Sequence, residues 1–197
     1  MFDISWFGHS AWPRLTFHRM GVYSRPAHLL FRKLNVTLSM NTVGGHMLQL
    51  GHLGQDLHIL KIDIEGGEWK VLEELVTSPL LDYVGQIVIE LHLDEIIHLD
   101  HTRALHLLQH RAALLVKLEA RGFVLAAYWD NQHTSNIFTL PSGSSVHTCG
   151  EGLYVNTKWI NSQTHTTTVD ALIHHYQSQP PPSLMQAELI GEAPPFD

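Results

Sequence analysis

The sequence predicts an α/β fold built around a parallel β-sheet. Residues 58–64 and 86–91 have the length and the apolar, β-branched composition of buried strands. Each is followed by an amphipathic helical pattern, at residues 68–76 and 100–121. Strands that alternate with helices in this way are typical of parallel sheets.

The first strand–helix unit reads HILKIDI at residues 58–64 and stops at Glu65-Gly66-Gly67. Trp69, Leu72 and Val76 then recur at helical spacing, which indicates a helix with a buried face. This spacing assigns Trp69 to the core.

The second unit reads QIVIEL at residues 86–91, and its helix ends at Arg121-Gly122. The spacing predicts that the core face of this helix carries Leu105, Leu108, Ala112, Leu115 and Leu118. Strand patterns at residues 123–129 and 151–157 follow with no helix between them, so we expect an antiparallel hairpin at the sheet edge. The folded domain then spans residues 1–160, and the proline-rich residues 161–197 form a mobile tail.

Composition excludes several classes of protein. The 197 residues suit one domain, and 44% hydrophobic residues are enough for a core. With 12 basic and 19 acidic residues the net charge is −7, which disfavours a nucleic-acid partner. No apolar run of about 18 residues encodes a membrane span. The single cysteine, Cys149, excludes an internal disulfide and a multi-cysteine zinc site, and we expect it to be a buried thiol.

The 16 histidines raise the question of a metal site. His106 and His110 have the i, i+4 spacing of two ligands on one helix, but Leu107, Leu108 and Gln109 separate them without the glutamate of an HExxH motif. They flank the expected core face, so we interpret them as a solvated rim. We assign no metal ligands from the sequence, and a histidine-based metal-binding protein is the weakest hypothesis.

The segment LKIDIEGGEW at residues 60–69, followed by Val71-Leu72, resembles a known motif. It is similar to the fourth-strand motif of the FkbM-type and methyltransferase-like 24 group of S-adenosylmethionine (SAM)-dependent methyltransferases, which is close to LKIDIEG-A-EW-x-VL, with Gly67 in place of the alanine. Residues 87–92 resemble the group's next strand, which ends in Glu-x-His, and residues 149–156 its last strand. The resemblance covers residues 2–159.

The resemblance implies a Rossmann-like methyltransferase domain that uses SAM to methylate a hydroxyl of a small molecule or glycan. Phe2-Asp3-x-Ser5 resembles the end of the group's second strand, so Asp3 would bind the cofactor ribose. The group's glycine-rich turn, (D/E)-x-G-x-x-x-G, would lie about twenty residues before that carboxylate. We therefore expect an N-terminally truncated domain that lacks the first βα unit with this turn.

Asp63 and Glu65 are the first candidate site residues. Ligands bind at the carboxyl ends of parallel strands, and alternate residues of a strand point to one side. Chiefly because of the resemblance to the family motif, we expect both carboxylates to border the cofactor and the acceptor. A role for Glu65 or Glu68 as a helix cap is the structural alternative, and we favour it for Glu68.

Glu90 and His92 share a face at the end of the next strand and extend the same cleft. We choose His92 as the base that takes the acceptor proton, and Glu65 is the second catalytic candidate. Two alternatives stay open: these side chains hold a divalent cation together with Asp63 and Glu65, or His92 only bonds a nearby loop. Asn131 and His133, in the loop after residue 129, are further candidates for acceptor contacts.

A second class of function is a catalytically inactive binding module. A domain without its first βα unit has an unpaired sheet edge and an uncovered apolar face. Such a surface favours association with a protein partner or with a second copy of the chain.

Overall fold

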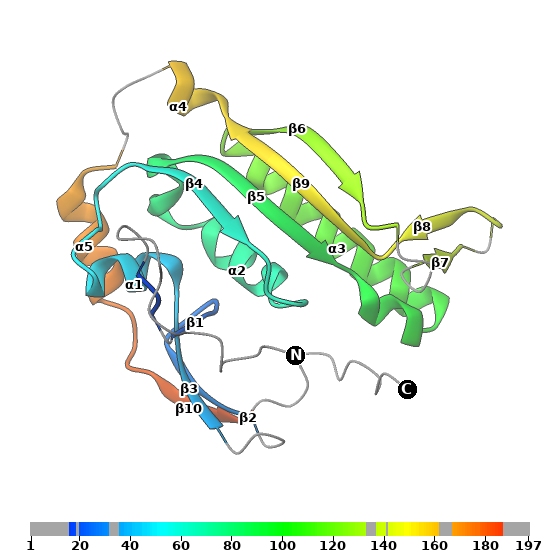
Figure 1. The fold of residues 1–197 in the computed structure, drawn as a ribbon, viewed down its shortest axis with the longest axis horizontal. Coiled ribbons are helices and arrows are strands. Elements are labelled where there is room, and N and C mark those ends of the chain that lie inside the picture. The colour runs from blue at the N-terminus through cyan, green and yellow to red at the C-terminus, as the bar shows by residue number, and fades with distance from the viewer. Residues whose placement is uncertain are drawn as a thin grey trace.

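The computed structural model describes residues 16–18, 20–31, 36–132, 137–140, 142–161 and 167–186. It has a larger sheet of order β4-β5-β9-β6 and a smaller sheet of order β1-β3-β2-β10 (Figure 1). Helices accompany both sheets, so the expected α/β class is confirmed, although each of these two sheets combines parallel and antiparallel pairs.

The larger sheet contains all four strands that the sequence indicates. These are β4 (Leu57–Ile62), β5 (Val84–His92), β6 (Phe123–Asp130) and β9 (Cys149–Asn156). β4 and β5 are parallel, whereas β9 lies between β5 and β6 and is antiparallel to both. The antiparallel pair is therefore confirmed, with β6 as the outer strand. A small hairpin of β7 (Ile137–Thr139) and β8 (Ser145–His147) lies between them in the chain.

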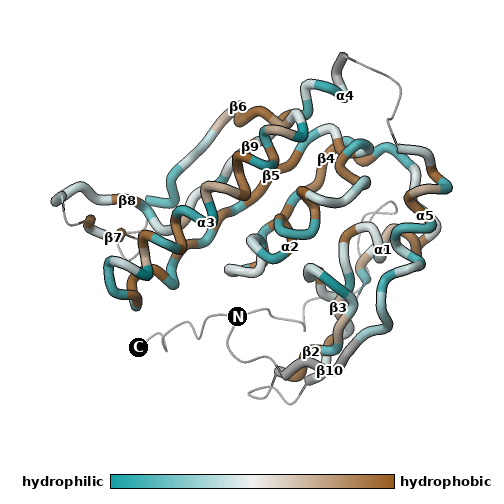
Figure 2. Tube along the Cα trace, turned by 180° about the vertical axis from the view of Figure 1, so that it is seen from behind, coloured by the Kyte–Doolittle hydropathy of each residue, from teal (hydrophilic) through white to brown (hydrophobic). Residues whose placement is uncertain are grey.

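Helices α2 (Glu68–Leu75) and α3 (His101–Ala120) lie on the same face of this sheet, as the front and back views agree (Figures 1 and 2). Two short 3-10 helices, Pro79–Tyr83 and Asp94–His98, connect them to β5. Alternation along β5 buries Ile87, Ile89 and Leu91 beneath the helices. Trp69 is 2% exposed within the same cluster, which confirms its assignment to the core.

The core face of α3 differs from the expected one. Leu118 is buried as expected, and Leu108 and Leu115 are half-buried. Leu105 is 57% exposed and Ala112 is also exposed, whereas Ala104 and Leu114 are buried. Successive residues of a helix point in directions about 100° apart. Because the buried stripe of α3 passes through residue 104, Leu105 points away from the core.

The smaller sheet contains β1 (Gly21–Val22), β2 (Ala27–Phe31), β3 (Val36–Asn41) and β10 (Ser183–Gln186). Helix α1 (Val43–Gln49) follows β3, and α4 (Thr157–Asn161) follows β9.

The region after residue 160 contributes to the fold, in contrast to the mobile tail that proline content predicts. Helix α5 (Val169–Gln177) buries Leu172 and Tyr176 in the main hydrophobic cluster, and β10 pairs with β2 in parallel. The apolar spacing of α5 is the sequence signal for this helix, and the prolines follow it.

The face of the larger sheet opposite α2 and α3 carries apolar side chains. Ile59 on β4 and Trp129 on β6 are each 57% exposed, and Val124 is 47% exposed. Val88 and Leu153 are paired in register between them and are half-buried. No strand of the described residues pairs with the outer edge of β4. No helix in the part of the chain that the structure describes is long and apolar enough to cross a membrane.

Glu74 on α2 provides a test of this packing. Its Oε1 accepts a hydrogen bond from Tyr176 Oη at 3.4 Å, and its buried Oε2 has no partner among the described residues. Burial raises the pKa of this carboxyl from 4.5 to about 7. The unfolded chain therefore ionises first as the pH rises, and the folded protein loses stability up to about pH 7.

We expect Glu74→Gln to raise the free energy of unfolding at pH 8 by about 2–3 kcal/mol and by much less at pH 5. Urea denaturation at both pH values measures the difference. Glu119→Gln, on an exposed position of α3, is the matched control. An equal increase in the free energy of unfolding for Glu74→Gln at both pH values would contradict the assignment of a buried charge.

Candidate functional site

The turn between β4 and α2 presents the acidic motif. β4 ends at Ile62, so the strand alternation that we expect to align Asp63 with Glu65 does not continue through the turn. Glu65 instead has a φ of 56° and Gly66 a φ of 96°. A left-handed glutamate costs about 1–2 kcal/mol, and such positions occur often at functional sites.

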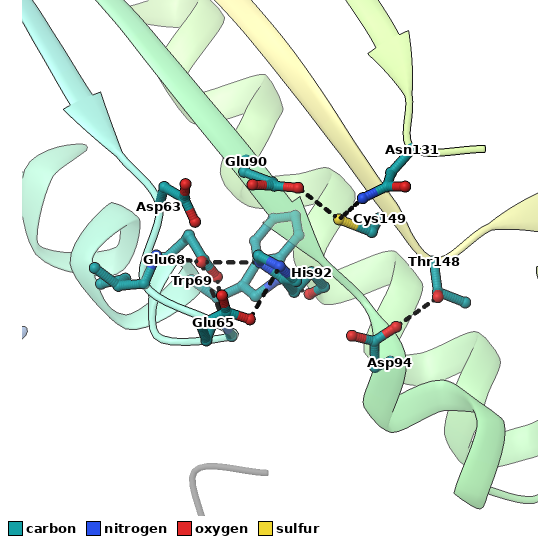
Figure 3. A network of polar contacts seen from close by, with 12 residues as sticks. Asp63, Glu65, Glu68, Trp69, Glu90, His92, Asp94, Asn131, Thr148 and Cys149 are labelled. Carbon is teal, nitrogen blue, oxygen red and sulfur yellow. Dashed lines mark hydrogen bonds and ion pairs between the residues drawn. The ribbon is translucent and has the colours of Figure 1, made fainter. Parts of the chain in front are cut away.

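The buried carboxylate of Glu68 holds this turn (Figure 3). Oε1 accepts the N–H of Ile64 at 2.9 Å, and Oε2 accepts the N–H of Gly66 at 2.9 Å. Oε1 also bonds His92 Nδ1 at 3.0 Å. Glu68 does lie in the first turn of α2, where a negative charge is favourable. Its hydrogen bonds, however, go to the preceding turn and to β5, so it does more than the predicted cap.

Both the backbone and the imidazole ring of His92 are held by hydrogen bonds. Its backbone carbonyl accepts a hydrogen bond from Trp69 Nε1 at 2.6 Å. The hydrogen bond to Glu68 is the main cause that raises the pKa of His92 to about 9, and the charges of Glu65 and Glu90 act in the same direction. His92 is therefore a cation at neutral pH, with Nε2 3.6 Å from Glu65 Oε2.

Cys149 lies opposite His92 in the register of β5 and β9. Its thiol donates a hydrogen bond to Glu90 Oε1 at 3.0 Å, and Asn131 Nδ2 donates to the sulfur at 3.8 Å. Burial, and then the bond to Glu90, raise the pKa of the thiol to about 12. The same bond lowers the pKa of the Glu90 carboxyl.

Asp63 completes the cluster next to Glu90 (Figure 3). Its pKa is raised by partial burial and by the charge of Glu90, against the opposing effect of Lys61. Lys61 Nζ lies 4.0 Å from Asp63 Oδ2 and 3.4 Å from Glu151 Oε2. The side chains of Asp63 and Glu65 are 38% and 65% exposed, so both can reach a ligand from solvent.

The structure brings four of the predicted site residues together: Asp63, Glu65, Glu90 and His92. Asn131, a candidate for acceptor contacts, lies beside them, and its Nδ2 donates to Cys149 Sγ. The structure adds Glu68 and Cys149, which bond His92 and Glu90 on β5. Only the β5–β9 register places Cys149 beside Glu90, and no local spacing in the sequence signals it. Asp3 and His133 lie outside the described residues.

His106 and His110 are not among the residues of this cluster. Among the described residues, the one group of three potential ligands with donor atoms close together is Glu90, His92 and Cys149. His110 instead lies beside Glu73, with Nε2 4.0 Å from Oε1. This arrangement agrees with the interpretation of the helical histidines as surface residues.

Chemically, the cluster can attract a cationic group and can hold or release protons. Four carboxylates, the buried one of Glu68 and those of Asp63, Glu65 and Glu90, surround one imidazolium at the carboxyl ends of two parallel strands. That edge is the common ligand site of open α/β sheets.

The pairing of Glu68 with His92 predicts an abnormal titration. In the metal-free protein we expect the His92 ring protons to titrate at about pH 9 in NMR spectra, and near the ordinary 6.5 in Glu68→Gln. His92→Gln identifies the signal, because it alone should disappear in that variant. A wild-type His92 that titrates near 6.5 would contradict the hydrogen bond.

Comparisons with known proteins give a consistent family resemblance. The chain is 26% identical over 149 residues to "Probable methyltransferase-like protein 24" of Homo sapiens, which covers 74% of this chain and 39% of the relative. The protein of the same name from Rattus norvegicus is 26% identical over 150 residues, covering 74% of this chain and 40% of the relative. The chain thus spans about two fifths of the length of these curated relatives.

No protein-family model matches the chain, and no solved structure matches it. The two relatives carry the group name to which the motif at residues 60–72 points, and they match over three quarters of the chain. In sequence, the chain is therefore similar to the methyltransferase-like 24 group.

Proposed function

We propose that this chain is part of a SAM-dependent methyltransferase domain of Rossmann-like architecture that transfers a methyl group to a hydroxyl oxygen. The observation that carries the proposal is the cluster of Asp63, Glu65 and His92 at the carboxyl ends of β4 and β5. The similarity to proteins named as methyltransferase-like supports the same reaction class.

The residues of the cluster fit SAM in part. SAM carries a cationic sulfonium and an ammonium group, and the exposed carboxylates of Asp63 and Glu65 offer complementary charge. Asp3 is proposed to bind the ribose, by resemblance. A glycine-rich turn after a first strand does not occur in the part of the chain that the structure describes.

When bound, SAM supplies an activated methyl group for in-line displacement, so the protein contributes mainly positioning and proton removal. Glu68 keeps His92 protonated at neutral pH. Within the proposed catalytic pair, Glu65 is then the group that accepts the hydroxyl proton, with its Oε2 3.6 Å from His92 Nε2. Above about pH 9, neutral His92 can take this role itself. The acceptor is a small molecule or a glycan.

Calorimetric titration of the full chain with SAM tests the cofactor proposal. We expect saturable binding that Asp63→Asn weakens about tenfold or more, because a charge-assisted contact contributes about 1.5–3 kcal/mol. Asp170→Asn, an exposed aspartate on α5, is the matched control and should bind as the wild type does. A folded chain that does not bind SAM would show that this chain is not an active methyltransferase.

The exposed apolar face of the larger sheet favours a second candidate function, that of a methyltransferase-like binding module. Ile59, Val124 and Trp129 leave apolar surface open on one face, and the edge of β4 has unpaired backbone groups among the described residues. The occupant would be a second copy of the chain or a protein partner.

Light scattering over a range of concentrations tests self-association through this face. We expect Ile59→Lys to shift the chain towards the monomer. Val116→Lys, at a 62% exposed position on α3, should leave the mass unchanged. A wild-type chain that is monomeric at every concentration would exclude self-association. The proposed occupant of this face would then be a different protein.

A further inference from the structure

Three side chains of different chemistry converge at the end of β5. One carboxylate oxygen of Glu90, one ring nitrogen of His92 and the sulfur of Cys149 all lie within 4.8 Å of one another (Figure 3). We propose that Glu90, His92 and Cys149 bind a Zn²⁺ ion.

Rigid backbone holds these three residues in place. Glu90 and His92 are alternate residues of β5 and so point to the same side of the sheet. Cys149 begins β9 directly opposite His92 in the antiparallel register. Ligands on paired strands need only small side-chain movements to approach a common ion, whose bonds would be about 2.0–2.3 Å long.

Glu68 leaves His92 with a nitrogen free for the metal. Its carboxylate bonds Nδ1 at 3.0 Å, which leaves Nε2 as the ring nitrogen for the metal. A buried carboxylate that orients a histidine through its second nitrogen is the usual arrangement around protein-bound zinc. Without a metal, the same Nε2 faces Glu65 at 3.6 Å.

The sulfur of Cys149 lies within reach of a metal at this point, and the metal would have to displace the thiol proton. At present the thiol donates to Glu90 Oε1 at 3.0 Å, and Zn²⁺ would replace this shared proton between the two ligands. The thiol proton, and the Nε2 proton where it is present, would leave to solvent as the Zn–S and Zn–N bonds form. Asn131 Nδ2, 3.8 Å from the sulfur, would donate to the resulting thiolate.

The donor set selects the type of metal. One thiolate, one imidazole and one carboxylate match Zn²⁺, whereas Mg²⁺ and Ca²⁺ take oxygen ligands. Three protein ligands leave a fourth position, which the 65% exposed Glu65 or an exchangeable ligand can occupy.

Zn²⁺ binding does not rest on the proposed function, although it concerns the same cluster. If both hold, a ligand at the fourth position would be polarised by the metal, and His92 would serve as a neutral metal ligand and not as the cation beside Glu65. If SAM does not bind, the zinc site can still exist. SAM titration therefore tests the proposed function, and metal titration tests the zinc site independently.

Cobalt provides a direct test, because Co²⁺ replaces Zn²⁺ and absorbs in the near ultraviolet when a thiolate coordinates it. The chain has a single cysteine, so this absorption can come only from Cys149. We expect one equivalent of Co²⁺ to produce the thiolate band in the full, reduced chain and Zn²⁺ to abolish it. Competition with a chromophoric chelator then measures the affinity for Zn²⁺.

Variants separate this site from binding to other histidines. We expect Cys149→Ser to remove the band, and Glu90→Gln to weaken Zn²⁺ binding at least tenfold. The double variant His106→Gln/His110→Gln changes the two helical histidines and should leave both the band and the affinity unchanged. Circular dichroism of each variant confirms that it is folded.

A folded wild-type chain without the thiolate band would overturn the proposal. So would tight Zn²⁺ binding that survives in folded Cys149→Ser, or that is lost in the His106→Gln/His110→Gln control. The wild-type spectrum decides the question even if a variant at the buried Cys149 does not fold.

Discussion

The carboxylate of Glu68 is the constraint on which the rest of the site depends. It is fully buried, and the N–H groups of Ile64 and Gly66 together with His92 Nδ1 surround its oxygens. A buried charge is tolerated only when it is paired and hydrogen-bonded in this way. The left-handed turn at Glu65, the orientation of the His92 ring and the raised pKa of His92 are therefore consequences of one interaction.

The antiparallel pairing of β5 with β9 assembles the rest of the site. It places Cys149 opposite His92, where the thiol bonds Glu90 and Asn131 bonds the sulfur. Acidic, basic and sulfur groups therefore lie together at the end of β5. The four carboxylates of Asp63, Glu65, Glu68 and Glu90 near one imidazole suit a positive ligand, whether the cationic groups of SAM or a metal ion. Both proposals use this electrostatic property, but they place different demands on His92.

The larger sheet has one covered and one open face. α2 and α3 lie on one side of the sheet (Figures 1 and 2). Ile87 and Ile89 are buried in the core on that side, while Ile59 and Trp129 stay exposed on the other. An apolar sheet face of this kind normally packs against another layer. The chain spans about two fifths of the length of its curated relatives. We propose that a second copy of the chain or a protein partner covers this face.

The sequence by itself determined the α/β class, the four strands and two helices of the larger sheet, and the candidates Asp63, Glu65, Glu90 and His92, because periodicity and strand ends are local properties. Only the tertiary structure decided the incorporation of α5, the exposure of Leu105 and the approach of Cys149 to Glu90. These depend on helix rotation and on strand register between residues 59 positions apart, which local patterns do not encode.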